Sequence, residues 1–179
     1  MIYMFLADGF EEVEALCPLD LLRRAGLEVT TVGVGGKQIR GSHGIAVEAD
    51  VTDGEFSDNA PDMIILPGGM PGTLNLGNSP VVLEAVHAAA TNGAYLATIC
   101  AAPSILGDLG YLSGKEAICY PGFEDRLRGA TISQNRVVRD GCVITAAGMG
   151  VALDFGLELV SVLACPEKAE ELRHAVLAD

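Results

Sequence analysis

The chain has 179 residues, enough to bury roughly 70% of its unfolded surface in one domain, which we expect to span residues 1–179. Half of the residues are apolar and the mean hydropathy is +0.37, as in folds whose strands are covered on both faces. The formal net charge of −13 repels phosphate backbones and anionic lipids, which argues against nucleic acid or a membrane as a partner.

The first part of the chain predicts a strand, a helix and a second strand. Residues 2–7 are apolar enough for a central strand, and residues 11–24 have helical spacing. Pro18 lies inside this helix and should kink it or start a new first turn, because an interior proline costs about 3 kcal/mol. Gly26 is placed to end the helix, and residues 27–34 follow as a strand. The segment is therefore predicted to be a βαβ unit.

The middle of the chain predicts three strands and a helix. Residues 44–49 alternate apolar and polar side chains, as a half-exposed strand does, whereas residues 63–66 and 95–99 are continuously apolar and predict buried strands. The loop 67–72 after the first of these is rich in glycine and proline. A helix is predicted over residues 81–90.

After Gly110 the pattern changes to short strands followed by two helices. The strand candidates are 116–120, 131–132, 137–139 and 142–145, the last two joined by a hairpin turn at 140–141. Residues 150–164 predict a strongly apolar helix and residues 166–177 a charged amphipathic one. Together the elements predict an α/β fold with a mainly parallel sheet and helices on both faces.

Cysteine and histidine usage argues against a disulfide framework and against a metal site. The five cysteines are dispersed and include no C-x-x-C pair; they are Cys17, Cys100, Cys119, Cys142 and Cys165. The histidines at 43, 87 and 174 have no ligand-spaced partner. The start of the chain lacks the basic segment and cleavage site of a signal peptide. We therefore expect a protein of the reducing cytoplasm that binds no metal and no cofactor.

The candidate nucleophile is Cys100. The buried strand 95–99 stops abruptly at this residue, and small residues after it predict the first turn of a helix. A cysteine on such a strand-to-helix turn is displayed at the edge of the sheet. There a helix dipole and free N–H groups would favour the thiolate. The alternative is that Cys100 is a small buried hydrophobic residue.

Three loops are predicted to gather at one edge of the sheet, because each leaves the carboxyl end of a strand. They are 7–12, 67–72 and 100–103. Glycines at 68 and 69 allow a backbone N–H to approach a small substrate, and together with the N–H of Ala101 they would form an oxyanion hole. The alternative for Gly68 and Gly69 is a tight turn that requires glycine. No Walker lysine is present, so the loop is not a phosphate-binding loop.

The acidic residues that open the first helix have two interpretations. Acids favour helix N-termini and stay solvated, which is the expectation for Glu11 and Glu12. Glu14 lies between Val13 and Leu16 and would point partly inward over the strand ends. A carboxyl buried there would have a raised pKa and would be able to move a proton.

The segments ADGFEEVEALCPLDLLRRAG, LPGGMPG and ATICAAPSIL together resemble the ThiJ/PfpI superfamily, and within it the branch of the human parkinsonism-associated deglycase. The stretch SQNRVVRDGCVITAAGMG also resembles that branch, so the resemblance covers nearly the whole chain. It implies a flavodoxin-like three-layer sandwich and a homodimer. It also implies a reactive cysteine at Cys100, a protonated glutamate at Glu14 and a backbone donor at Gly69.

Two positions depart from the resembled proteins. The protease-like branch has a histidine directly after the cysteine, where this chain has Ala101, so peptidase activity is not expected. The deglycase branch often has a histidine at the position of Tyr120, which can donate a hydrogen bond but is a poor base at neutral pH. His43 matches a position near the site in some relatives, across the dimer; the alternative is an exposed loop histidine.

Two functions follow from the resemblance. The first is a cofactor-free glyoxalase or deglycase, in which Cys100 adds to methylglyoxal, glyoxal or an early glycation adduct and Glu14 relays a proton. The second is an oxidative-stress sensor or redox-regulated chaperone, in which Cys100 is oxidised to the sulfinate and Glu14 stabilises it by a hydrogen bond.

Overall fold

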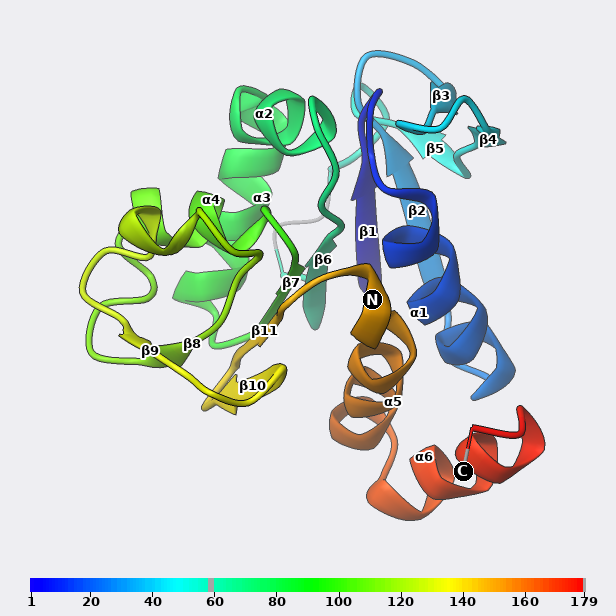
Figure 1. Cartoon of the computed structure of the whole chain (residues 1–179). Coiled ribbons are helices and arrows are strands. Elements are labelled where there is room, and N and C mark those ends of the chain that lie inside the picture. The colour runs from blue at the N-terminus through cyan, green and yellow to red at the C-terminus, as the bar shows by residue number, and fades with distance from the viewer. Residues whose placement is uncertain (58–59, 179) are drawn as a thin grey trace.

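A computed structural model of the chain describes residues 1–57 and 60–178 (Figure 1). Its centre is a seven-stranded sheet in the order β10-β11-β7-β6-β1-β2-β5. Neighbouring strands in this sheet are parallel except for the pair β10–β11. The strands are β1 (Ile2–Leu6), β2 (Val29–Gly33), β5 (Val51–Thr52), β6 (Met63–Leu66), β7 (Tyr95–Ile99), β10 (Val137–Asp140) and β11 (Val143–Ala146).

Helices cover both faces of this sheet, so the predicted flavodoxin-like sandwich is confirmed (Figure 1). One layer contains α1 (Glu12–Arg24), α5 (Ala152–Leu163) and α6 (Pro166–Ala175). The other contains α2 (Gly72–Gly77), α3 (Pro80–Thr91) and α4 (Pro103–Asp108). The single turns η1 (Glu124–Arg126) and η2 (Met149–Val151) complete the helical segments.

The central strands are apolar on both faces because each face has its own helical layer. In β6, Met63 and Ile65 pack into the core under α1 and α5. Ile64 and Leu66 of the same strand pack into the core under α3 and α4. This alternation explains why the strand is a continuous apolar run in the sequence.

Of the two outcomes predicted for Pro18, a new first turn does not occur, because α1 runs as one helix from Glu12 to Arg24 with Pro18 inside it. Gly156 of α5 lies directly against this part of α1. A Cβ on Gly156 would lie 2.9 Å from the Cα of Pro18 and 2.7 Å from Cδ1 of Leu21. The two helices therefore pack closely where the proline has no N–H to donate.

Short elements account for the other differences from the prediction. The expected strand 44–49 is β4 (Ala46–Glu48), which pairs with the unpredicted β3 (Gln38–Arg40) in an antiparallel hairpin. The candidate 116–120 is reduced to β8 (Glu116–Ala117), parallel to β9 (Thr131–Ile132). The short α2 begins at Gly72, the last residue of the predicted loop, and no element was predicted for the rest of it.

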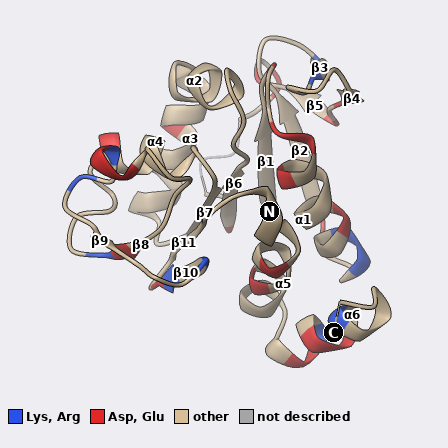
Figure 2. Cartoon of the chain, viewed as in Figure 1, with Lys and Arg blue, Asp and Glu red and all other residues tan. Residues whose placement is uncertain are grey.

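Two whole-chain expectations are also tested by the structure. Within residues 1–57 and 60–178, no helix combines the length and the apolar character needed to cross a membrane. Acidic side chains are spread over the helices of both layers (Figure 2). All five cysteines are free, in agreement with the expected lack of a disulfide framework.

Candidate active site

Strand order places the candidate site at the point where the chain changes the direction in which it adds strands to the sheet. The parallel strands lie in the order β2-β1-β6-β7-β11, so the chain adds β2 on one side of β1 and then β6, β7 and β11 on the other side. Ligands of open α/β sheets bind beyond the carboxyl ends of the strands at such a switch point. The loops after β1, β6 and β7 meet there, as the sequence predicts.

Cys100 occupies a strained turn between β7 and α4. Its φ of +64° lies in the left-handed region, which costs a residue with a side chain about 1–2 kcal/mol. Two backbone hydrogen bonds join Cys100 to other segments. The N–H of Cys100 donates to the carbonyl of Ala146 (2.9 Å), and the N–H of Tyr120 donates to the carbonyl of Cys100 (2.8 Å). The surrounding structure thus stabilises a conformation that turns the partly buried thiol out of the sheet.

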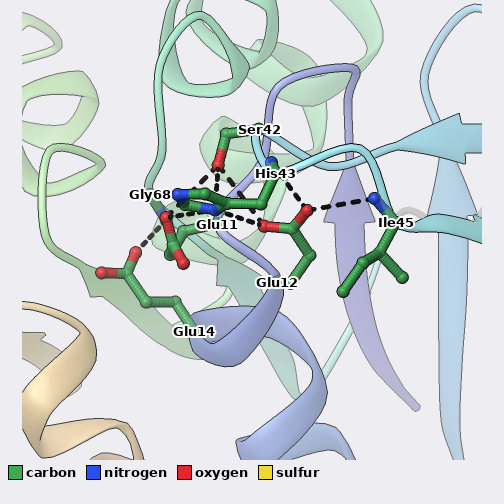
Figure 3. Close-up of polar contacts among 7 residues, drawn as sticks. All are labelled: Glu11, Glu12, Glu14, Ser42, His43, Ile45 and Gly68. Atoms are coloured by element: carbon green, nitrogen blue, oxygen red, sulfur yellow. Dashed lines mark hydrogen bonds and ion pairs between the residues drawn. The ribbon is translucent and has the colours of Figure 1, made fainter.

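Glu14 projects from the first turn of α1 and is 1% exposed. Its side chain forms a hydrogen bond with the thiol of Cys100, and its Oε2 accepts from the N–H of Gly68 (3.0 Å; Figure 3). A Cβ at Gly68 would lie 2.5 Å from that oxygen and 2.6 Å from Cβ of Cys100. Glycine at this position therefore allows the carboxyl and the thiol to meet.

Two backbone N–H groups face the sulfur of Cys100. They belong to Gly69 and Ala101, the two donors expected from the sequence. Gly69 has a φ of +91°, and a Cβ there would collide with the backbone of the loop after β1. The two loops are joined by a hydrogen bond from the N–H of Glu11 to the carbonyl of Gly68 (2.9 Å).

Burial dominates the electrostatics of the pair. It raises the pKa of Glu14 to about 7, against hydrogen bonds from Cys100 and from the N–H of Gly68. It also raises the pKa of Cys100 to about 12, and the charge of Glu14 adds to this rise. The Gly69 and Ala101 N–H groups lower the thiol pKa but do not outweigh burial. The helix N-terminus predicted to favour the thiolate therefore does not lower the thiol pKa below its ordinary value, because the sulfur is withdrawn from water and lies against Glu14.

A fourth loop contributes to the site and was missed by the sequence analysis. The N–H of Met149, in the turn after β11, forms a further hydrogen bond with Glu14. A Cβ at Gly148 would lie 3.3 Å from the ring of Tyr120 and 3.9 Å from Oε1 of Glu14. Tyr120 is half-exposed beside this turn. Because β11 is parallel to β7, its carboxyl end lies at the same edge, which is the signal that would have identified the loop.

Glu12 differs from its expected solvated state, because it is 4% exposed and bound by the β3–β4 turn. Its Oε1 accepts from the N–H of His43 (2.8 Å), and its Oε2 lies 3.0 Å from Nδ1 of His43. Burial would raise the pKa of Glu12, but hydrogen bonds from backbone N–H groups and the His43 ring lower it to about 2. His43 itself is exposed, and the hydrogen bond to Glu12 raises its pKa.

No ligand-spaced partner was predicted for any histidine, but the folded chain brings His43 beside two glutamates. Glu11, Glu12 and His43 each present a potential ligand atom, and these atoms lie within 4.8 Å of one another. Because 31 residues separate Glu12 from His43, spacing along the sequence gives no sign of the group. Figure 3 shows the side chains of Glu14 and Glu12 leaving the start of α1 on different sides.

The fold and this geometry define a class of protein: a flavodoxin-like α/β protein with a cysteine on a strained elbow against a buried glutamate. The sequence matches the DJ-1/PfpI family over residues 1–162, and the chain belongs to that family. The resemblance to the ThiJ/PfpI superfamily is therefore confirmed.

Relatives are similar along nearly the whole chain. Protein dj-1beta of Drosophila melanogaster is 34% identical over 177 residues, which cover 97% of this chain and 95% of the relative. A Caenorhabditis elegans protein named glutathione-independent glyoxalase DJR-1.2 is 31% identical over 164 residues, covering 90% and 87%. The structure of Toxoplasma gondii DJ-1, described as oxidized, superposes with a TM-score of 0.91 at 31% identity, covering 98% and 97%.

Proposed function

We propose that the protein is a cysteine-dependent glyoxalase or deglycase that acts on methylglyoxal, glyoxal or early glycation adducts without a cofactor. The observation that carries this proposal is the Cys100–Glu14 pair, a nucleophile in contact with a buried carboxyl whose pKa is about 7. A group with that pKa both accepts and donates protons near neutral pH. The name of the Caenorhabditis elegans relative supports a dicarbonyl substrate.

The proposed reaction begins when the sulfur of Cys100 attacks the aldehyde carbon of methylglyoxal. Glu14 accepts the thiol proton and delivers it to the aldehyde oxygen, which gives a hemithioacetal. Glu14 then removes the hydrogen on that carbon as a proton and delivers it to the oxygen of the second carbon, which gives an enediol. Protonation of the second carbon, with loss of the proton from the oxygen of the first, gives a lactoyl thioester, which water hydrolyses to lactate and the free thiol. One carbon is oxidised and its neighbour reduced, so no external oxidant is needed.

Backbone and rim groups support this sequence in the proposal. The N–H groups of Gly69 and Ala101 stabilise negative charge on the sulfur and on the oxygen of the adduct. Gly68 holds the carboxyl of Glu14 through its N–H and leaves room for the thiol. Tyr120 stands beside the site and donates a hydrogen bond to the second carbonyl of the substrate.

The first test is methylglyoxal consumption with lactate measured as the product. We expect turnover by the wild-type protein, loss of at least about a thousandfold in Cys100→Ser because the covalent route is removed, and wild-type rates in Cys142→Ser. Cys142 is a matched control because it is a free, exposed cysteine away from the loops described. Equal turnover in Cys100→Ser would overturn the role of Cys100. A folded, reduced wild type without turnover would overturn the dicarbonyl substrate.

A second function, redox sensing or a redox-regulated chaperone, is favoured by the same partly buried thiol beside a proton donor. The Toxoplasma gondii relative described as oxidized supports it. Two equivalents of peroxide would convert the thiol through the sulfenic to the sulfinic acid, with water as the other product. We expect intact mass spectrometry to show two added oxygens on wild-type protein and none on Cys100→Ser. Oxidation that is equal in both proteins contradicts this function.

We further infer that two copies pair through α1. Val13 and Leu16 are exposed apolar side chains on this helix. Ile45 and Met149 are also exposed, and their backbone N–H groups form hydrogen bonds with Glu12 and Glu14.

A free catalytic thiol further supports a reducing compartment such as the cytoplasm.

A further inference from the structure

Four side-chain donor atoms from two separate segments gather beside the start of α1. Glu11 and Glu12 come from the helix start, and Ser42 and His43 come from the β3–β4 turn (Figure 3). The Nδ1 atom of His43 lies 3.0 Å from Oε2 of Glu12 and 3.6 Å from Oε2 of Glu11. This mixture of one imidazole nitrogen and several oxygens is a common ligand set for divalent transition metals.

The spacing of these atoms fits a tetrahedral zinc site. Zinc bonds to nitrogen and oxygen are about 2.0–2.2 Å long, so neighbouring ligand atoms in a tetrahedron lie about 3.3–3.6 Å apart. The hydroxyl of Ser42 lies 3.3 Å from Oε2 of Glu11, 3.4 Å from Oε2 of Glu12 and 3.1 Å from Nδ1 of His43. With the two His43 distances, five ligand–ligand separations fall between 3.0 and 3.6 Å.

Backbone groups already orient the central carboxylate. Oε1 of Glu12 accepts from the N–H groups of His43 (2.8 Å) and Ile45 (3.4 Å), so Oε2 faces the other donor atoms. Such hydrogen bonds to the second oxygen are what fix a ligating carboxylate in metal sites. In the single chain the Glu12 side chain is 5% exposed and that of His43 is 69% exposed, so His43 lies on the solvent side of the group.

The charges at this position also favour a cation. The negative charges of Glu11 and Glu12 repel each other. Both carboxylates face the same side chain, that of His43. A divalent ion would neutralise both. It would also join α1 to the β3–β4 turn, two segments that are far apart in the sequence.

We propose that Glu11, Glu12 and His43 bind one divalent transition-metal ion of the zinc class, with the hydroxyl of Ser42 or a water as the fourth ligand. The site is distinct from Cys100 and does not depend on the proposed enzyme activity. The N–H of Glu11 donates to the carbonyl of Gly68, so the ion would also stiffen the glycine loop behind the thiol. Without an ion, the same contacts are a hydrogen-bonded tether for the hairpin.

The test uses the full chain carrying Cys100→Ser, which removes the thiol that contacts Glu14 as a competing ligand. Co²⁺ serves as a spectroscopic probe and Zn²⁺ as the competitor. We expect one Co²⁺ per chain with visible bands of a four- or five-coordinate ion, no thiolate charge-transfer band, and displacement by Zn²⁺. Adding His43→Ala should weaken binding at least roughly tenfold. His87→Ala, at an exposed histidine of α3, should leave binding unchanged.

Three outcomes would overturn the proposal: no saturable binding, a thiolate charge-transfer band, or equal binding with and without His43. If His43→Ala fails to fold by circular dichroism, Glu11→Gln replaces it, because that change preserves the backbone contacts of Glu12. Loss of binding in Glu11→Gln supports the metal site. Unchanged binding contradicts it and leaves only hydrogen bonds between α1 and the hairpin.

Discussion

Above about pH 7, Glu14 and Cys100 are best considered as one unit that shares the proton of the thiol. Burial opposes charge on either group, and two charges in contact would cost more than one. Transfer of the proton from sulfur to carboxylate creates the thiolate without exchange with solvent. In the proposed reaction this allows a thiol with a raised pKa to act as a nucleophile at neutral pH, with Gly69 and Ala101 stabilising the anion.

The raised pKa of Glu14 predicts a pH-dependent loss of stability. Between its ordinary value of 4.5 and about 7, the folded protein keeps a proton that the unfolded chain releases. The contribution of Glu14 to stability is therefore greatest below pH 4.5, falls as pH rises and levels off above 7. The total change is on the order of 3 kcal/mol, because each tenfold change in proton affinity is worth about 1.4 kcal/mol.

Urea unfolding of Glu14→Gln and wild type at pH 5, 6, 7 and 8 measures this effect. Glutamine does not titrate, so the variant should gain stability relative to wild type up to about pH 7 and then stay constant. Glu28→Gln changes an exposed glutamate, so its free energy of unfolding should differ from that of wild type by the same amount at every pH. A constant difference between Glu14→Gln and wild type would show that Glu14 titrates alike in folded and unfolded protein.

At the scale of elements, the sequence predicts those parts of the site that depend on local pattern. The runs 63–66 and 95–99 correspond to β6 and β7 because buried parallel strands are continuously apolar. Their carboxyl ends place the glycine loop and Cys100, and the parallel register brings these loops together. The orientation of Glu14 follows from helical spacing once α1 is placed.

Features that depend on contacts between distant segments could not be predicted in this way. The β3–β4 hairpin is three residues per strand and lies between glycines, so its sequence reads as turns. Its position decides the burial of Glu12, whose hydrogen bonds come from residues more than 30 positions away. The thiol pKa depends on how much water the four loops exclude, which no residue pattern encodes.

For the whole molecule, the proposed dimer must overcome repulsion between two chains of net charge −13. Figure 2 shows acids on α1, α5 and α6, so pairing through α1 brings like charges together. Association then depends on apolar contact, for which Val13 and Leu16 of α1 are exposed. Dimerisation should therefore strengthen with added salt, which screens the repulsion but not the apolar contact.

Val13→Asp tests this pairing without disturbing the fold. Val13 is 45% exposed and lies in the first turn of α1, where an added acid favours the helix dipole. In a symmetric pair the change removes two apolar contacts and adds two charges, so we expect the dimer to weaken at least roughly tenfold. Sedimentation equilibrium measures it, with Leu177→Asp, at an exposed leucine beyond α6, as the control. If the variant sediments like a dimeric wild type, the interface does not include this part of α1. If the wild type itself sediments as a monomer, the proposed dimer is contradicted.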